Sequence, residues 1–374
     1  MYDVAFAPCG DYEYARVRAA LDDAVARTTD LSWLRPGMTV AVKVNLITFA
    51  HPDRAATTHP AVVRAVCEML TERGAQVAVG DSPGGIFTAP YVERVYAACG
   101  LTELGFPLNR DFTEVHVSDG AGKVCREFDC TAWLEKADAV VDVCKLKTHG
   151  MMTLTAGVKN LFGAVPGTKK PEYHFRYPNP ADFADMLIDI CEHIAPRLTV
   201  CDAVTAMEGN GPTAGAPRQV GYLAVSENPH ALDKCLADLI GLPAERTPTL
   251  AAAQARGLLP ESLTVFGQPA PIPDYDIPAG GGLLFEGRGG VFGKLRSAVM
   301  GRALTARPAL TADKCVSCRK CAEVCPAGAI DMAAGRPKID RKKCIRCFCC
   351  QEFCPQGALY VHRSAVARLL SGSR

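Results

Sequence analysis

Residues 139–149 read Ala139-Val140-Val141-Asp142-Val143-Cys144-Lys145-Leu146-Lys147-Thr148-His149, and this stretch indicates the fold class. Its first part, residues 139–144, is a short apolar run of the kind that forms a buried strand. Its second part, residues 145–149, follows without a break, so we expect it at the carboxyl end of that strand. Open α/β sheets bind ligands at the carboxyl ends of their strands, so the stretch predicts a sheet and a site together.

Similar apolar runs recur along the first 270 residues and are separated by longer amphipathic stretches. Strands are predicted at residues 3–7, 38–44, 76–80, 139–144, 198–202 and 220–225. Helices are predicted between them, at residues 14–27, 60–73, 91–98, 181–194 and 231–240. This alternation predicts an α/β domain, with a mainly parallel sheet and helices on both of its faces.

The charge of the chain changes sign toward its C-terminal end. The 374 residues carry 41 Lys and Arg against 40 Asp and Glu, a net charge of +1 that gives no bias toward nucleic acid. Residues 311–374 hold 12 Lys and Arg against 5 Asp and Glu, which leaves +7 there and −6 in residues 1–310. The Pro- and Gly-rich run from Pro269 to Gly293 is typical of a linker.

We therefore expect four segments. They are an α/β domain over residues 1–270, a linker over 271–305, a small α+β domain over 306–363 and a tail over 364–374. Within the linker, residues 291–304 are amphipathic, which suits a helix packed between the domains or a helix lying on a membrane surface.

Cysteine is unusually frequent, with 18 residues, of which nine lie between Cys315 and Cys354. The first residues show no secretory signal, and no stretch approaches the roughly 18 apolar residues of a membrane span. We expect a cytoplasmic protein without a transmembrane segment. In that reducing compartment, clustered cysteines are metal ligands more often than disulfides.

The clustered cysteines form an internal repeat. Cys315-x2-Cys318-x2-Cys321-x3-Cys325-Pro326 returns 29 residues later as Cys344-x2-Cys347-x2-Cys350-x3-Cys354-Pro355. The likeness continues beyond the cysteines, because residues 326–330 match residues 355–359. A pair of zinc sites is the alternative interpretation, although zinc needs neither the third Cys at the next x2 spacing nor the Cys-Pro that ends each run.

This repeat resembles the bacterial two-cluster ferredoxins, over about 50 residues. In that family three closely spaced thiolates hold one cubane, and the fourth Cys of each run crosses to the other cluster. The resemblance implies one 4Fe-4S cluster on Cys315, Cys318, Cys321 and Cys354, and a second on Cys344, Cys347, Cys350 and Cys325. Each oxidised cluster with its thiolates carries about −2, so the local basic excess compensates the clusters. Cys349 fits neither run and is a free thiol or an exchange partner of Cys350.

A basic stretch occupies residues 145–176 of the acidic larger segment, with six Lys and Arg against one Glu. It contains glycines that allow close backbone approach, next to amines and amides that could hold an anion. A solvated basic loop is the alternative. The candidate cofactor-binding residues lie here and at other expected strand ends: Lys43, Asn45, Asp81, Ser82, Thr148, Asn160, Lys169, Glu208 and Asn210.

The larger segment resembles the bacterial and archaeal family called domain of unknown function 362. The resemblance depends on five short stretches, at residues 43–45, 81–85, 145–149, 157–163 and 208–212. Members often carry a C-terminal ferredoxin-like module, so the resemblance implies iron–sulfur binding but no substrate. A fainter likeness, Lys159 ahead of a Pro-Gly turn, is similar to the catalytic domain of lactate racemases that hold a nucleotide-derived nickel cofactor.

These observations predict an iron–sulfur oxidoreductase. Two 4Fe-4S clusters would take electrons from a redox partner protein or a small donor and pass them to an anionic substrate or a flavin-like or nucleotide-like cofactor. The expected catalytic residues are Lys145, Lys147, Lys159 and His149. The lysines would neutralise the anion, and either His149 or a bound water would supply a proton. The alternatives are a non-catalytic electron carrier or docking subunit, and a racemase- or lyase-like site with accessory clusters.

Overall fold

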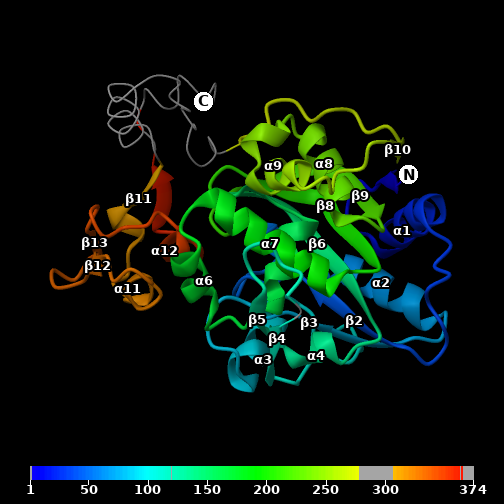
Figure 1. Ribbon diagram of the computed structural model, residues 1–374, viewed down its shortest axis with the longest axis horizontal. Coiled ribbons are helices and arrows are strands. Elements are labelled where there is room, and N and C mark those ends of the chain that lie inside the picture. The colour runs from blue at the N-terminus through cyan, green and yellow to red at the C-terminus, as the bar shows by residue number, and fades with distance from the viewer. Residues whose placement is uncertain (1, 119, 278–305, 363, 365–374) are drawn as a thin grey trace.

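The computed structural model describes residues 2–118, 120–277, 306–362 and 364. Figure 1 shows a large twisted sheet covered by helices, and a small module that lies beside α6 (Lys170–Arg176). Among the described residues, no helix combines the length and apolar character that crossing a bilayer requires. The predicted helix at residues 291–304 lies outside the described residues.

The large sheet has eight strands in the described residues, and most of them are parallel. In spatial order they are β10 (Leu263–Phe266), β1 (Tyr2–Pro8), β9 (Ala216–Ser226), β8 (Leu198–Glu208), β6 (Ala139–His149), β2 (Thr39–Val44) and β3 (Gln76–Gly80), with β7 (Thr153–Thr155) paired to β6. Only β9 and the short β7 run antiparallel to their neighbours. The predicted mainly parallel sheet is therefore confirmed.

Three strands are several residues longer than expected, and one of them, β9, begins at Ala216 rather than at Val220. β6 was expected to end at Cys144 but continues through the polar residues to His149, and β8 continues to Glu208 rather than ending at Asp202. The two strands remain paired, from Val141 opposite Leu198 up to Lys147 opposite Met207, with an irregularity between Lys145 and Lys147. The lysines of the opening stretch are thus strand residues. Successive side chains of a strand alternate between the two faces of the sheet, so Lys145 and Lys147 lie on the same face.

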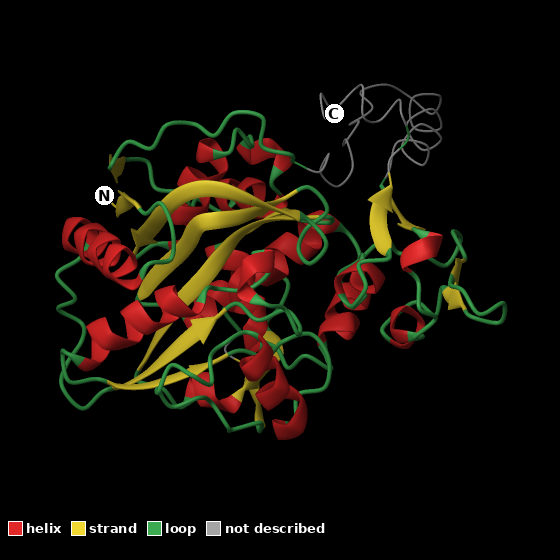
Figure 2. Ribbon diagram, turned by 180° about the vertical axis from the view of Figure 1, so that it is seen from behind, coloured by secondary structure: helices red, strands yellow, loops and turns green. Residues whose placement is uncertain are grey.

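Helices cover both faces of the sheet, as the alternation predicted. On one face Val141 and Val143 of β6 pack with α1 (Tyr14–Thr28), α2 (Pro60–Thr71) and α3 (Ala89–Ala98). In Figure 2, which views the molecule from the side opposite to Figure 1, α1 and α2 lie in front of the sheet. On the other face Val140 and Cys144 pack toward three further helices, namely α7 (Pro180–Ile194), α8 (Pro229–Leu239) and α9 (Pro248–Ala255).

Shorter elements complete the larger part. A hairpin of β4 (Glu114–Ser118) and β5 (Glu127–Thr131) leads into α4 (Ala132–Glu135). Between β7 and α6, the short helix α5 (Gly157–Asn160) continues into η2 (Leu161–Ala164). The remaining short turns are η1 (Pro52–Arg54) and η3 (Ala244–Arg246). At the end of the described part, Tyr275 is buried and donates a 3.0 Å hydrogen bond to the Met207 carbonyl.

The C-terminal module is a small α+β unit, as expected. It consists of β11 (Arg307–Leu310), η4 (Ala312–Lys314), α11 (Lys320–Glu323), β12 (Ile330–Asp331), β13 (Lys338–Ile339), α12 (Cys349–Glu352) and β14 (Leu359–His362). β11 pairs with β14 and β12 with β13, both antiparallel.

The sequence repeat is also a repeat of backbone conformation. Ser317 and Arg319 have φ of 55° and 66°, and their equivalents 29 residues later, Arg346 and Phe348, have 62° and 63°. The left-handed conformation is uncommon outside glycine, so four such residues at matched positions mark one loop built twice.

α7 illustrates how buried polar groups hold the α/β domain together. Asn179 caps the helix by accepting from the Ala181 N–H, and Pro180 occupies its first turn. Further along, the buried carboxylate of Asp189 accepts from the backbone N–H groups of residues 123, 124 and 125, at 2.8–3.0 Å. It also pairs with Arg256 Nη1 at 2.8 Å. One side chain thus joins the helix to the loop before β5 and to the end of α9.

Removing this carboxylate is expected to destabilise the fold. Asp189→Ala leaves three backbone donors and one guanidinium without their acceptor, which should lower the free energy of unfolding by about 3 kcal/mol. Urea unfolding followed by circular dichroism measures this change. Asp182→Ala, in the exposed first turn of the same helix, should change it by less than about 0.5 kcal/mol. Equal effects of the two variants would contradict this role for Asp189.

Candidate functional site

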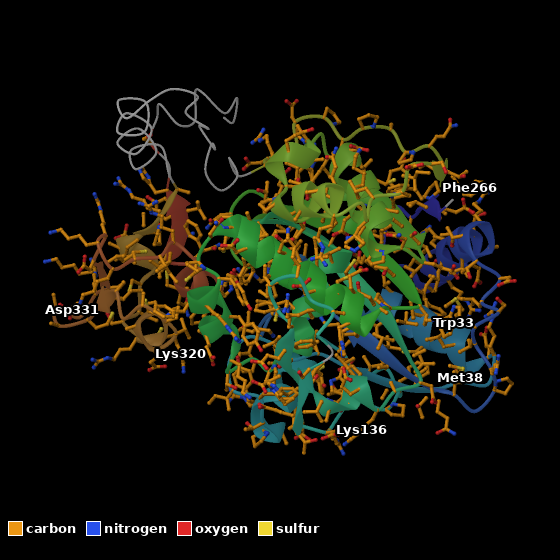
Figure 3. The ribbon with its side chains drawn as sticks, viewed as in Figure 1. Trp33, Met38, Lys136, Phe266, Lys320 and Asp331 are labelled. Carbon is orange, nitrogen blue, oxygen red and sulfur yellow. The ribbon has the colours of Figure 1, made fainter. Side chains whose placement is uncertain are left out.

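A cavity of about 610 Å³ lies where the α/β domain meets the C-terminal module. From the α/β domain it is lined by residues that follow β2 and β3 and by α5, η2 and α6. From the module it is lined by Lys320, Glu323, Val324, Glu352, Phe353 and Pro355. Lys320 is labelled on the module in Figure 3. Because both parts supply its walls, the cavity exists only in the assembled chain.

Asn160 of α5 organises the polar wall of this cavity. Its Nδ2 donates to Asp142 Oδ1 at 2.7 Å, and its Oδ1 accepts from Asn45 Nδ2 at 2.7 Å and from Lys43 Nζ at 3.0 Å. Burial raises the pKa of Asp142 to about 8, against the opposing effect of Lys43. Every polar atom of the Asn160 side chain is therefore used for structure, and it orients the residues around it.

Lys43 and Asp81 form a buried ion pair in the same wall, with 2.9 Å between Nζ and Oδ1. Asp81 also accepts from the backbone N–H of Leu46 and of Ser82. Gly163 lies directly over this pair, because a Cβ added there would come within 2.2 Å of Asp81 Oδ1 and 2.4 Å of Lys43 Nζ. The glycine expected to let a ligand approach the backbone thus makes room for this ion pair.

Two lysines remain to meet an anion in the cavity. Among the acids of its wall, Asp81 pairs with Lys43, and Glu323 pairs with Lys320 at 3.2 Å. Glu352 lies 2.8 Å from His149 Nε2 and also attracts Lys159. Lys159 lines the cavity half-buried, and its ammonium has no hydrogen bond or ion pair to any residue that the structure describes. Within the described residues, Lys170 donates only to the Ser82 carbonyl oxygen, and burial lowers the pKa of Lys170 to about 7.

The remaining cavity wall is largely aromatic and apolar. His174 of α6 is buried, stacks on Phe183 at 4.3 Å between ring centroids, and lines the cavity. Burial lowers the pKa of His174 to about 3, so this ring is neutral at pH 7. At the other side of the cavity Phe49 and Ile86 are exposed large apolar residues. The cavity therefore combines cations with apolar surface, as sites for organic anions do.

Lys145 and Lys147 do not line the cavity. They alternate with Asp142, Cys144 and Leu146 along β6, so their side chains lie on the face of α1 and α2. Lys145 Nζ pairs with Asp202 Oδ2 at 2.7 Å and donates to the Tyr12 hydroxyl at 2.8 Å. Lys145 and Asp202 are both buried, so the charge of this lysine is neutralised by a carboxylate of the protein itself.

Lys147 is held in a similar way but without a carboxylate partner. Its Nζ donates to Asn45 Oδ1 at 2.6 Å and to the Ala56 carbonyl oxygen at 2.7 Å. Burial lowers the pKa of Lys147 well below its usual value. Lys147 thus orients Asn45, whose amide contacts Asn160 on the cavity side, and acts as a second layer behind the wall.

His149 contacts the module rather than the cavity. Its Nδ1 accepts from the backbone N–H groups of Met151 and Met152, both at 3.1 Å, so the ring proton of the neutral form lies on Nε2. Nε2 lies 2.8 Å from Glu352 Oε1 of the module. Burial lowers the pKa of His149 to about 4, with Lys159 adding to the effect. Burial alone would raise the pKa of Glu352, but His149 and Lys159 bring it below its usual range.

Asn210, expected to bind a cofactor, joins the two parts of the chain. Gln351 Nε2 donates to the carbonyl oxygens of Asn210 and Gly211, at 3.0 and 3.1 Å. In return, Asn210 Oδ1 accepts from the Val361 N–H at 3.1 Å. Thr148 supports the same loop by donating to the Gly209 carbonyl oxygen.

The other expected cofactor residues divide into two groups. Glu208 accepts from the Asp276 N–H, and Lys169 pairs with Glu114 and Asp129 near the surface, so neither lines the cavity. The expected residues that do line it are Lys43, Asn45, Asp81, Ser82, Lys159 and Asn160. Lys170 was not among the expected site residues, because nothing local distinguishes it from its neighbour Lys169. His174 was considered from the sequence as a proton donor, with a hydrogen-bonded structural histidine as the alternative.

The cysteines of the module surround two hollows. Cys315, Cys318, Cys321 and Cys354 line one of them. Cys325, Cys344, Cys347 and Cys350 line the other, together with the buried Cys349. The fourth cysteine of each run therefore lies with the three cysteines of the other run.

The surroundings of these thiols fit iron–sulfur clusters. The Ala329 N–H donates to Cys325 Sγ at 3.3 Å, and the Ala358 N–H donates to Cys354 Sγ at 3.2 Å. Backbone donors to sulfur stabilise the negative charge of cluster ligands. At least four thiols line each hollow, with backbone N–H groups near them, and such a donor set suits a cubane cluster better than a hard metal ion.

Comparisons with known proteins agree with both parts of this architecture. A model of the family described as domain of unknown function (DUF362) matches residues 40–238, and a model of the 4Fe-4S dicluster domain matches residues 307–355. A thylakoid-associated protein of Synechocystis sp. is 36% identical over 236 residues, which make up 61% of this chain and 71% of that protein.

Among solved structures, the lactate racemase apoprotein from Thermoanaerobacterium thermosaccharolyticum is 13% identical, with a TM-score of 0.43. The likeness covers 64% of this chain and 57% of the racemase, so this chain spans little more than half of it. The DUF362 match alone covers more than half of the present sequence. The chain is an iron–sulfur protein and belongs to the DUF362 family.

Proposed function

We propose that this protein transfers electrons to an anionic organic ligand held in the cavity between its two domains. The observation that carries the proposal is the shared wall of that cavity. Cys354 lies between Phe353 and Pro355, and Cys325 follows Val324, and these three neighbours line the cavity. On the opposite wall Lys159 and Lys170 face the same space. A ligand bound there would lie between the cations and the cysteine segments.

The proposal includes two 4Fe-4S clusters with crossed ligands. One would be held by Cys315, Cys318, Cys321 and Cys354, and the other by Cys325, Cys344, Cys347 and Cys350. When bound, such clusters supply one-electron transfer. Cys349 remains a thiol beside the second set. Because these thiols must stay reduced before they take up iron, the proposal places the protein in the cytoplasm.

The walls of the cavity indicate the chemistry of the ligand. Its volume of about 610 Å³ suits a molecule of cofactor size. Lys159 and Lys170 would neutralise a phosphate or carboxylate group. Phe49, Ile86 and Phe162 offer apolar surface for a ring system. These features support a flavin-like or nucleotide-like ligand.

Lys170 is also suited to proton transfer during ligand reduction. Its pKa of about 7 allows it to hold or release a proton near neutral pH. Our expectation that His149 would do this is replaced in the proposal, because the Nε2 of that ring lies against Glu352 and outside the cavity.

Iron analysis tests the cluster assignment. The protein purified without oxygen should contain about eight irons per chain, and Cys354→Ala should retain roughly half of them, since it removes one ligand of one set. Cys349→Ala is the matched control and should retain all of them. Iron and acid-labile sulfide assays with electron paramagnetic resonance provide the measurement. Fewer than about four irons in the fully reconstituted wild type would rule out two clusters.

Mass spectrometry of the anaerobic protein tests the ligand. We expect a stoichiometric organic anion in the wild type, and its affinity should fall by about tenfold to a hundredfold in Lys159→Met, which loses one charge-assisted contact. Lys136→Met, at an exposed site distant from the cavity, should bind it as the wild type does. A full complement of iron with no organic ligand would instead favour an electron carrier.

The pH dependence of ligand binding follows from Lys170. Below pH 7 its amine is charged and attracts the anion, and above pH 7 the free site loses that charge. Affinity should therefore be highest near pH 6 and fall by up to about tenfold per pH unit above 7. Equilibrium dialysis between pH 6 and 8.5 measures this dependence. Lys170→Met should bind more weakly at pH 6 with a flatter profile, and an unchanged profile would exclude Lys170 as its source.

A further inference from the structure

The two copies of the cysteine loop differ in their exposure. In the second copy, Phe348 and Cys349 are only 4% and 1% exposed. In the first copy the equivalent residues, Arg319 and Lys320, are exposed, and Val316 beside them is 61% exposed. One copy is therefore covered by the α/β domain and the other faces solvent.

The sequence of each copy suits its surroundings. Phe348 packs with apolar residues of the α/β domain, and a Cβ added at Gly150 would lie 3.6 Å from its ring. Cys349 occupies the position at which the first copy has Lys320, where a lysine would have to bury its charge. The second copy therefore has uncharged residues at its buried positions, whereas the first copy has basic residues at the equivalent, solvent-exposed positions.

The exposed copy combines an apolar centre with unpaired cations. Cys318 is exposed in the same loop, and it lines the first hollow together with Val316 and Arg319. Within the described part of the module, eight exposed basic residues make no ion pair with any described residue: Arg307, Lys314, Arg319, Arg336, Lys338, Arg341, Lys342 and Lys343. Two of the few acids, Asp331 and Asp340, accept from backbone N–H groups nearby.

We propose that the loop at residues 314–320 is the docking surface for an acidic electron-carrier protein. The inference rests on the proposed function, because such a carrier would supply the electrons that the proposed function requires. One electron would leave the reduced carrier and enter the oxidised iron–sulfur centre beneath Val316 and Cys318, and no bond would form or break. Lys314 and Arg319 would steer the acidic partner, and Val316 would contact its apolar centre.

A protein partner fits this surface better than a lipid bilayer. Helices and loops that bind membranes insert several large apolar side chains, whereas this loop presents one valine. An electron carrier must also come close to the cluster, and the exposed Cys318 marks the point where the module leaves that approach open. Charge complementarity would speed this encounter and make it sensitive to salt.

Charge reversal in the loop tests the proposal. Reduced flavodoxin, a small acidic carrier protein, is mixed with the anaerobic holoprotein. Stopped flow follows the loss of the iron–sulfur absorbance of the holoprotein as it is reduced. Lys314→Glu/Arg319→Glu should lower the second-order rate constant by about tenfold or more at low salt. Its affinity for oxidised flavodoxin, measured by calorimetry, should fall in parallel. Arg319 also lines the first hollow, so iron content is measured for every variant. Lys314→Glu alone, which leaves that lining intact, should lower the rate in the same direction, with the iron content and the reduction by dithionite of the wild type.

The matched control is Lys136→Glu/Arg126→Glu, which changes the net charge equally at exposed sites of the α/β domain. An equal effect of both double variants, or no effect of either, would overturn the docking surface. Binding to phosphatidylserine vesicles that only the loop variant loses, with unchanged reduction by flavodoxin, would assign the surface to membranes instead. If flavodoxin reduces the protein through the loop but the cavity holds no organic ligand, the proposed function fails and the docking surface stands.

Discussion

The cost of burying lysine determines the arrangement at the carboxyl end of the sheet. Lys43, Lys145 and Lys147 are almost fully buried, and an ammonium removed from water is stable only with close partners. Asp81 and Asp202 supply charge to two of them, and Asn45 supplies an amide oxygen to the third. In this chain, three of the five stretches that carry the family resemblance, residues 43–45, 81–85 and 145–149, hold these lysines and most of their partners, and the cavity wall is built on this framework.

The sequence indicated most of the fold because the hydrophobic pattern is local. The expected strands and helices of the large sheet all exist, with ends displaced by a few residues. β6 and β8 ran further than expected, because lysine in a sequence suggests exposure and a strand end. Here pairing with neighbouring strands and with Asp202 keeps Lys145 inside the sheet. Alternation along the longer strand then separates this lysine from the face where Lys43 and Asn160 meet.

The site was only partly predictable, for a related physical reason. The grouping of the cysteines into two sets was expected from the resemblance to two-cluster ferredoxins, and the lining of the two hollows matches that grouping. The cavity depends instead on contacts between distant segments, such as Gln351 with Asn210, 141 residues apart, or His149 with Glu352. No local pattern marks Glu352 or Phe353 as walls of a ligand site. Hence Asn210 and His149 were taken for binding groups, whereas they hold the module against the domain.

The seam between module and domain has a consequence for assembly. Among the described residues, its polar contacts centre on Gln351, Glu352 and Val361, a small set for holding two separate proteins together. Within one chain the partner is always near, at an effective concentration that reaches the millimolar range for short connections. Covalent attachment thus allows a small interface to keep the two parts associated, whereas separate chains would need a larger one. Expressed as two separate polypeptides, the same domains would share the fold of each part but rarely the cavity between them.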